Sequence, residues 1–114
     1  MPAPIRLLIH GASGRMGRAL LRLATIDARF AITGAVTRAG GKIDGMRALS
    51  AERIAAAPAF DVLVDFSLPT AFDGVLELCL QRGSALVSGT TGFSAAQRSA
   101  LDSATKAIPV VWAA

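Results

Sequence analysis

The chain has 114 residues, 53% of them hydrophobic, and carries 12 lysines and arginines against 8 aspartates and glutamates, a net charge of +4. This length fits one domain with a buried core, and no apolar run approaches the roughly 20 residues of a membrane span, so we expect no membrane partner. The arginines are dispersed and form no cluster with aromatic residues, so the charge favours anionic small molecules and we expect no nucleic-acid partner.

A strand, a glycine-rich turn and a helix open the chain. Residues 5–10 are predicted to form an apolar strand covered on both faces, and residues 15–26 a helix. Between them, Gly11 would permit the turn, Gly14 the approach of phosphates to the backbone, and Gly17 the close packing of the helix on the strand. Such a turn aims backbone N–H groups at a dinucleotide pyrophosphate; the alternative is a glycine-rich turn without a ligand.

Periodicity and turn signals define the elements up to residue 57. The helix over 15–26 is expected to bury one apolar face, formed by Met16, Leu20, Leu23 and Ala24, opposite a basic face formed by Arg15, Arg18 and Arg22. A strand follows over residues 30–37, and then a glycine-containing loop over 38–49 that shows no clear period. Ser50 is expected to cap a short helix over residues 51–57.

The second half of the chain continues the alternation of strand and helix. The predicted elements are a strand over 61–66, a helix from Pro69 to about Gln81 that Gly83 ends, a strand over 85–88, a helix from the Ser94–Gln97 capping box to about Lys106, and a strand over 109–112. The buried face of the first of these helices is expected to hold Phe72, Val75, Leu76 and Cys79. Alternation with short connections predicts an α/β fold with a doubly wound parallel sheet of the Rossmann type over residues 1–114.

The single cysteine and the two ends of the chain bear on compartment and completeness. Cys79 has no partner for an internal disulfide, and residues 1–4 lack the basic start of a signal peptide, so we expect a cytoplasmic protein with Cys79 as a core thiol. Residues 112–114 end the chain directly after an apolar strand, where the next ligand-bearing loop would begin. We therefore expect the cofactor half of a larger enzyme, truncated before its substrate domain.

Three segments carry a family resemblance: GASGRMGR at residues 11–18, DFSLP at residues 65–69 and GTTGF at residues 89–93. Together they resemble the 4-hydroxy-tetrahydrodipicolinate reductases, the dihydrodipicolinate reductases of the diaminopimelate route to lysine. The segments fall in the family's order, and the resemblance covers the whole chain. Residues 110–114 resemble the strand before the family's Asn-containing cofactor loop. That loop, and the substrate domain with its His-His and Lys motif, are not in this sequence.

The resemblance implies a reaction and a set of cofactor-binding residues. Hydride would pass from NADPH or NADH to a cyclic, unsaturated dicarboxylate to give tetrahydrodipicolinate, in a full-length enzyme expected to be a homo-oligomer. The implied pyrophosphate cradle consists of Gly11, Ala12, Ser13, Gly14, Arg15, Met16 and Gly17. Phe66 and Ser67 would line the cofactor cleft, and Gly89, Thr90 and Thr91 would lie near the nicotinamide ribose. We expect no catalytic residue and no metal ligand within this chain.

Some of these residues also have plainer interpretations. The alternatives are a solvated side chain for Arg15, packing and helix capping for Phe66 and Ser67, and an ordinary turn for residues 89–92. Asp65 ends an apolar strand, where we expect it to accept hydrogen bonds from nearby loop N–H groups and shape the turn, rather than to act in catalysis. His10, the only histidine, is expected to be structural, with contact to the bound cofactor as the alternative.

The choice of cofactor depends on the end of the second strand. An NAD-specific site usually places an acidic residue about 20 residues past the glycine motif, but residues 34–39 contain none, and the acid frequent in the family is missing. Arg38 would pair bidentately with a 2′-phosphate, with Lys42 assisting, unless Arg38 is simply a solvated loop residue. We therefore expect NADPH, with NADH as the alternative because the family is often tolerant.

Two other functions remain open on the residues alone. The alternatives are a stand-alone dinucleotide- or CoA-binding regulatory module, and a part of another Rossmann reductase related to the aspartate and homoserine dehydrogenases. The gene sequence beyond residue 114 distinguishes them: a His-His-x-x-x-Lys motif supports the reductase, whereas a stop codon supports the module.

Overall fold

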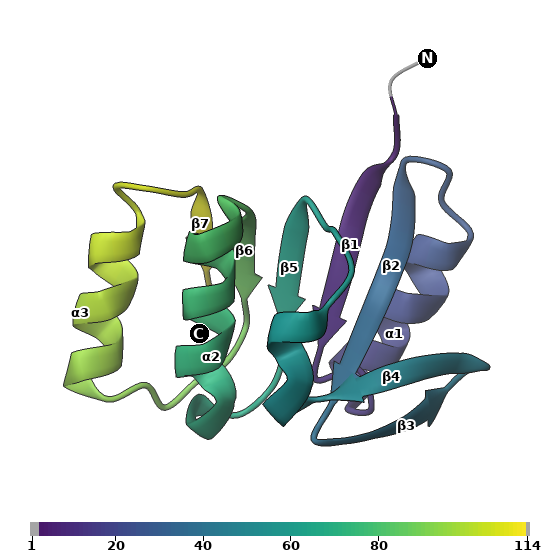
Figure 1. The fold of residues 1–114 in the computed structure, drawn as a ribbon, viewed down its shortest axis with the longest axis horizontal. Helices are drawn as coiled ribbons and strands as arrows, with labels where there is room; N and C mark the ends of the chain where they lie inside the picture. The colour runs from purple at the N-terminus through teal and green to yellow at the C-terminus, as the bar shows by residue number, and fades with distance from the viewer. Residues whose placement is uncertain (1–2, 114) are drawn as a thin grey trace.

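The computed structural model describes residues 3–113, and Met1, Pro2 and Ala114, on which the expectations about the chain ends partly rest, lie outside them. Seven strands form one sheet in the order β3-β4-β2-β1-β5-β6-β7 (Figure 1). The elements are β1 (Ile5–His10), α1 (Arg15–Thr25), β2 (Phe30–Thr37), β3 (Ala39–Ile43), β4 (Met46–Ser50), η1 (Ala51–Ala56), β5 (Val62–Asp65), α2 (Pro69–Arg82), β6 (Ala85–Ser88), α3 (Ala95–Ala104) and β7 (Val110–Trp112). Neighbouring strands are parallel except β3 and β4. The prediction of a Rossmann-type α/β fold is confirmed.

Helices cover both faces of the sheet (Figure 1). Ile9 of β1 packs in one buried cluster with Leu21 of α1. Leu8 belongs to a second cluster, which contains Phe72 of α2 and Leu101 of α3. Successive side chains of a strand point to opposite faces, so β1 must be apolar at both positions. This is why its sequence is a continuous hydrophobic run.

Helix α1 packs on the sheet with a face that differs from the predicted one. Its buried residues are Gly17, Leu21 and Ala24. Met16 and Leu23, which were predicted to be buried, are 54% and 64% exposed. The prediction was wrong for these two residues because Gly17 packs against the glycine turn and so fixes which face of the helix is buried. Leu21 and Ala24 lie on the same face as Gly17, whereas Met16 and Leu23 do not.

Residues 38–49, predicted as a loop, instead form most of a β-hairpin at the sheet edge. Strands β3 and β4 pair antiparallel from Ile43 opposite Met46 to Ala39 opposite Ser50. The chain reverses at Asp44 and Gly45, whose φ angles are 47° and 81°. Two positive φ angles are what a two-residue type I′ hairpin turn requires, and Asp-Gly is its usual sequence signal. The loop prediction overlooked that signal.

The remaining predictions agree with the structure, apart from one cap. Helix α2 buries Phe72, Val75, Leu76 and Cys79, as predicted. The capping box of Ser94 and Gln97 is present at the start of α3. The predicted short helix is the 3₁₀ helix η1, and the side chain of Ser50 makes no capping hydrogen bond to it. None of the helices in the described part of the chain is long and apolar enough to cross a membrane.

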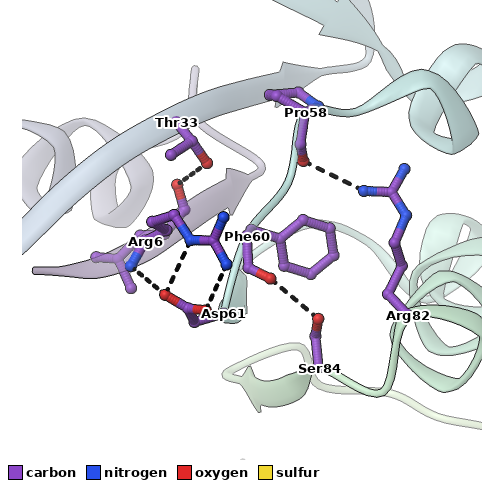
Figure 2. Close-up of polar contacts among 8 residues, drawn as sticks. Arg6, Thr33, Pro58, Phe60, Asp61, Arg82 and Ser84 are labelled. Atoms are coloured by element: carbon purple, nitrogen blue, oxygen red, sulfur yellow. Dashed lines mark hydrogen bonds and ion pairs between the residues drawn. The ribbon is translucent and has the colours of Figure 1, made fainter. Parts of the chain in front are cut away.

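Polar contacts fasten the amino-terminal ends of the central strands (Figure 2). The guanidinium of Arg6 in β1 pairs with the carboxylate of Asp61 just before β5, at 2.9 Å from Nη2 to Oδ1. The hydroxyl of Ser84 donates to the carbonyl of Phe60. At the end of α2, Arg82 donates to backbone carbonyls of η1 and of the segment after it. These contacts lie at the amino-terminal ends of the strands, whereas the groove described next lies at their carboxyl-terminal ends.

Candidate functional site

A groove of about 870 Å³ opens at the carboxyl-terminal ends of β1 and β5. Its lining residues are His10, Gly11, Ser13, Gly14, Arg38, Ala51, Glu52, Phe66, Ser67, Leu68, Thr70, Ala71 and Gly74. They come from the glycine turn, the end of β2, η1, and the turn into α2 with the first half of that helix. In open α/β sheets, ligands bind outside the carboxyl ends of the strands, where the connections change faces. The groove therefore lies where this fold binds its ligands.

The glycine turn is too tight for side chains at two of its positions. Gly11 has a φ of +76°, and a Cβ there would lie 2.6 Å from the carbonyl oxygen of Phe66. A Cβ on Gly17 would lie 2.2 Å from the carbonyl oxygen of Gly11. At Gly14 the nearest atom is 3.4 Å away. Gly11 thus permits the turn, as predicted, whereas Gly17 packs against the turn rather than against the strand, and Gly14 leaves space on the side that lines the groove.

Backbone N–H groups remain free where the turn meets α1. The N–H groups of Gly11 and Ala12 donate to the carbonyl of Val36, and that of Gly14 donates to Gly11. The N–H of Arg18 donates to the carbonyl of Gly14, but within residues 3–113 the N–H groups of Ser13, Arg15, Met16 and Gly17 have no backbone acceptor. No acidic side chain occupies the first turn of α1. The start of α1 therefore presents free donors and the positive end of a helix dipole.

Asp65 is the centre of a buried hydrogen-bond network beneath the groove. Its side chain is 0% exposed. Oδ1 accepts the backbone N–H and the hydroxyl of Ser67. Oδ2 accepts the hydroxyl of Thr90 at 2.9 Å and that of Ser88 at 3.3 Å. The expectation that Asp65 shapes the following turn is confirmed, and the network also reaches β6 and the loop after it.

The network keeps the Asp65 carboxylate charged. Burial disfavours the charged form, but the His10 imidazole, 3.2 Å away, and the hydrogen bonds from Ser67 outweigh this effect, so the pKa of Asp65 is lowered. A carboxylate that accepts hydrogen bonds from several donors stays ionised at pH values below those at which a free carboxyl group takes up its proton. The hydroxyls of Ser67 and Thr90 are committed to Asp65, which restricts what they offer to a ligand.

The structure brings about half of the predicted cofactor residues together. Those in the groove lining are Gly11, Ser13, Gly14, Arg38, Phe66 and Ser67. Ala12 is buried below the turn, and Arg15 and Met16 lie exposed at the start of α1. Gly89, Thr90 and Thr91 are not among the lining residues. Gly89 instead packs against the aromatic ring of Phe66. A Cβ added at Gly89 would lie 2.2 Å from that ring.

Two charged side chains line the groove on the side of the hairpin. Arg38 follows β2, lines the groove and is exposed. Lys42 lies in β3 opposite Arg47 and does not line the groove. Glu52 of η1 does line it, and sequence reasoning overlooked this residue as a site component. Its only signal was its place in the first turn of a short helix after β4.

Other candidate groups in the described residues are structural. Cys79 is fully buried in the core, as predicted, and burial raises the pKa of its thiol to about 12. Trp112 packs against Phe93 and donates its indole N–H to the carbonyl of Thr90 at 3.0 Å. Between residues 3 and 113, no group of three or more histidine, cysteine, aspartate or glutamate side chains is placed to hold a metal ion.

The glycine turn joins a buried strand to a helix at the carboxyl-terminal ends of the strands, and helices cover both faces of the sheet. These features define a Rossmann-type domain. Residues 5–114 match the protein family described as "Dihydrodipicolinate reductase, N-terminus". The chain belongs to this family. The alternative that the chain is part of a reductase related to the aspartate and homoserine dehydrogenases is therefore wrong.

Curated relatives carry the same name at high identity. The 4-hydroxy-tetrahydrodipicolinate reductase of Stenotrophomonas maltophilia (strain K279a) is 55% identical over 115 residues, which cover 96% of this chain and 48% of that protein. The reductase of the same name from Xanthomonas campestris pv. campestris (strain B100) is 52% identical over 114 residues, with 97% and 48% coverage. The chain thus spans about half the length of the curated relatives that it matches.

Solved structures with low sequence identity share the fold. The dipicolinate-bound dihydrodipicolinate reductase from Paenisporosarcina sp. TG-14 has a TM-score of 0.69 at 22% identity, over 90% of this chain and 42% of that one. The aspartate semialdehyde dehydrogenase with NADP from Candida albicans has a TM-score of 0.61 at 14% identity, over 77% and 30%. At these identities the likeness supports the Rossmann-type fold alone.

Proposed function

We propose that this chain is the dinucleotide-binding part of an enzyme that reduces 4-hydroxy-tetrahydrodipicolinate to tetrahydrodipicolinate in lysine and diaminopimelate biosynthesis. The observation that carries the proposal is the open groove beside the glycine turn, which free backbone N–H groups at the N-terminus of α1 adjoin. Family membership supplies the reaction. The full-length protein is proposed to act in the cytoplasm as a homo-oligomer on this small dicarboxylate.

The groove fits a dinucleotide in shape and in chemistry. The turn is closely packed at Gly11 and Gly17, and its open side at Gly14, which lines the groove, leaves room for a pyrophosphate. The backbone N–H groups of Ser13 and Arg15 would hold the phosphates, and Phe66 and Ser67 would form the wall toward the nicotinamide end. When bound, NADPH or NADH supplies the hydride. Gly89, Thr90 and Thr91 would support this wall and lie near the nicotinamide ribose.

Calorimetry of cofactor binding tests the proposal. We expect the purified protein to bind NADPH, and adenosine-2′,5′-bisphosphate to retain most of the affinity, because the proposed contacts of the glycine turn and Arg38, which line the groove, are with the adenosine half of the cofactor. The segment 1–114 alone is expected to show no turnover, since we place the substrate contacts in the other half of the family's length. A folded sample that binds neither ligand at millimolar concentration would contradict the assignment of the glycine turn.

Arg38 is proposed to select NADPH through its 2′-phosphate. Replacing Arg38 with aspartate should weaken NADPH binding by about 1.5–3 kcal/mol, the size of a hydrogen bond to a charged group. NADH affinity should hold or improve, because the new carboxylate can accept the ribose hydroxyls. Calorimetry with both cofactors at two salt concentrations measures the ratio of the NADPH affinity to the NADH affinity. In the unmodified protein this ratio should fall as the salt concentration rises.

The control for Arg38 is Lys42→Asp, which makes the same change of charge on an exposed strand outside the groove lining. This variant should leave the preference between the two cofactors nearly unchanged. Equal losses of both cofactors in Arg38→Asp would indicate damage to the hairpin. An unchanged NADPH affinity in that variant would show that Arg38 does not contact the 2′-phosphate.

A further inference from the structure

Glu52 brings an exposed carboxylate to the groove. It lies in the first turn of η1 and lines the groove together with Arg38, which is also exposed. None of the ion pairs among residues 3–113 involves either residue. The two side chains of opposite charge therefore line one groove without pairing with each other, and the carboxylate of Glu52 is free to contact a ligand.

Small and apolar residues line the same groove. Ala51 immediately precedes Glu52, and Leu68, Ala71 and Gly74 belong to the turn into α2 and to the first half of that helix. Helix η1 lies against both β4 and α2 (Figure 1). Leu68 is 61% exposed, so much of its apolar surface is uncovered. Apolar walls beside a carboxylate suit a flat aromatic base that carries a hydrogen-bond donor on its edge.

The strand order places Glu52 beside the base of a bound dinucleotide. Strands β1, β2 and β4 are consecutive neighbours, and they lead into the glycine turn, Arg38 and η1. Thr37 of β2 pairs with Ser50 of β4, so Arg38 and Ala51 follow at the same level of the sheet. Successive strand ends are about 4.8 Å apart. A dinucleotide with its pyrophosphate at the glycine turn and its 2′-phosphate at Arg38 would therefore continue toward η1 with its adenine.

We propose that the carboxylate of Glu52 accepts a hydrogen bond from the 6-amino group of the adenine and so selects adenine over a 6-oxo purine. The inference rests on the proposed function and adds a specificity-determining residue to it. Hypoxanthine carries a carbonyl oxygen at position 6, which accepts hydrogen bonds and donates none, as a carboxylate does. Beside Glu52 this base would leave two acceptors facing each other, which disfavours its binding.

The experiment compares the binding of NADPH with that of its hypoxanthine analogue, reduced nicotinamide hypoxanthine dinucleotide phosphate. The two ligands carry the same phosphates, so the ratio of their affinities, the base preference, reports on the base alone. Calorimetry measures both affinities at one pH and one salt concentration. We expect the unmodified protein to bind NADPH about tenfold more tightly than the analogue, the lower end of the effect of a hydrogen bond to a charged group.

Two variants of Glu52 remove the preference in different ways. The amide of Glu52→Gln both donates and accepts, so it can meet either base, and the base preference should fall to about twofold or less. Glu52→Ala offers neither a donor nor an acceptor, and its base preference should fall as far. The matched control is Glu77→Gln, the same substitution on an exposed residue of α2 outside the groove lining, which should keep the base preference of the unmodified protein.

The outcomes separate this inference from the proposed function. If the unmodified protein binds neither dinucleotide, both fail. If it binds NADPH and the analogue equally well, the function stands and the role of Glu52 is overturned. A base preference that persists in both Glu52→Gln and Glu52→Ala has the same meaning. If Glu52→Gln keeps the base preference but weakens the binding of NADH more than that of NADPH, Glu52 contacts the ribose hydroxyls instead, and the inference is likewise overturned.

Discussion

Gly17→Ala is expected to destabilise the protein by about 3 kcal/mol or more, although alanine normally favours a helix over glycine by about 1 kcal/mol. The added Cβ would lie 2.2 Å from the carbonyl oxygen of Gly11 and 2.7 Å from Cα of Ala12. Both are backbone atoms, which cannot move aside as the end of a flexible side chain can. Urea unfolding monitored by circular dichroism measures the change in the free energy of unfolding.

Gly14→Ala is the matched control in the same turn. Gly14 has a φ of −76°, which alanine adopts freely, and the nearest atom to its Cβ would be 3.4 Å away. Its stability should stay within about 1 kcal/mol of the unmodified protein. A loss for Gly14→Ala as large as that for Gly17→Ala would show that steric crowding at Gly17 is not the cause.

Asp65→Ala should destabilise the protein by about 3–5 kcal/mol, the range for removing one partner of a buried charged network. The substitution leaves the hydroxyls of Ser67 and Ser88 without their acceptor, leaves that of Thr90 with only the carbonyl of Ser67, and removes the carboxylate beside His10. Chemical denaturation at neutral pH measures the loss. Asp61→Asn provides the contrast, because its partner Arg6 is half exposed and surface ion pairs contribute little.

The acid side of the stability profile should also identify Asp65. Its folded-state pKa is lowered, so its contribution is fully present above the unfolded value of about 3.9 and is lost as the pH falls through the folded value. Asp65→Asn should flatten this part of the profile. Asp27, whose pKa is lowered to about 2, is unchanged in the variant and cancels from the difference. Parallel profiles for the two proteins between about pH 5 and pH 2 would refute this role of Asp65.

Much of the fold is predictable from local patterns in the sequence. The apolar runs of β1 and β5 mark strands that are buried on both faces, and the periodicity of α2 identifies its buried face correctly. The glycine turn was predictable because strand, glycines and helix are consecutive in the sequence. The hairpin was missed because three glycines within residues 38–49 obscured the Asp-Gly turn signal. The face of α1 was missed because Gly17, with no side chain, was not counted as buried.

The site was less predictable, because its contacts join distant segments. That Asp65 bonds to Ser67 follows from their separation of two residues, but the bonds to Ser88 and Thr90 depend on the pairing of β5 with β6. Glu52 reaches the groove only because β4 adds to the sheet beside β2. The incomplete hydrogen bonding of His10 depends on burial, which no sequence pattern shows.

The network around Asp65 has a consequence for the entropy of ligand binding. It connects the ends of β5 and β6 to the turns that follow them, and the 3.2 Å contact between Asp65 and His10 adds the end of β1. Fixing a backbone residue costs roughly 1–2 kcal/mol of conformational entropy. Here most of that cost falls on folding, so a ligand meets turns that are already ordered. More of its contact energy then appears as affinity and as discrimination between similar ligands.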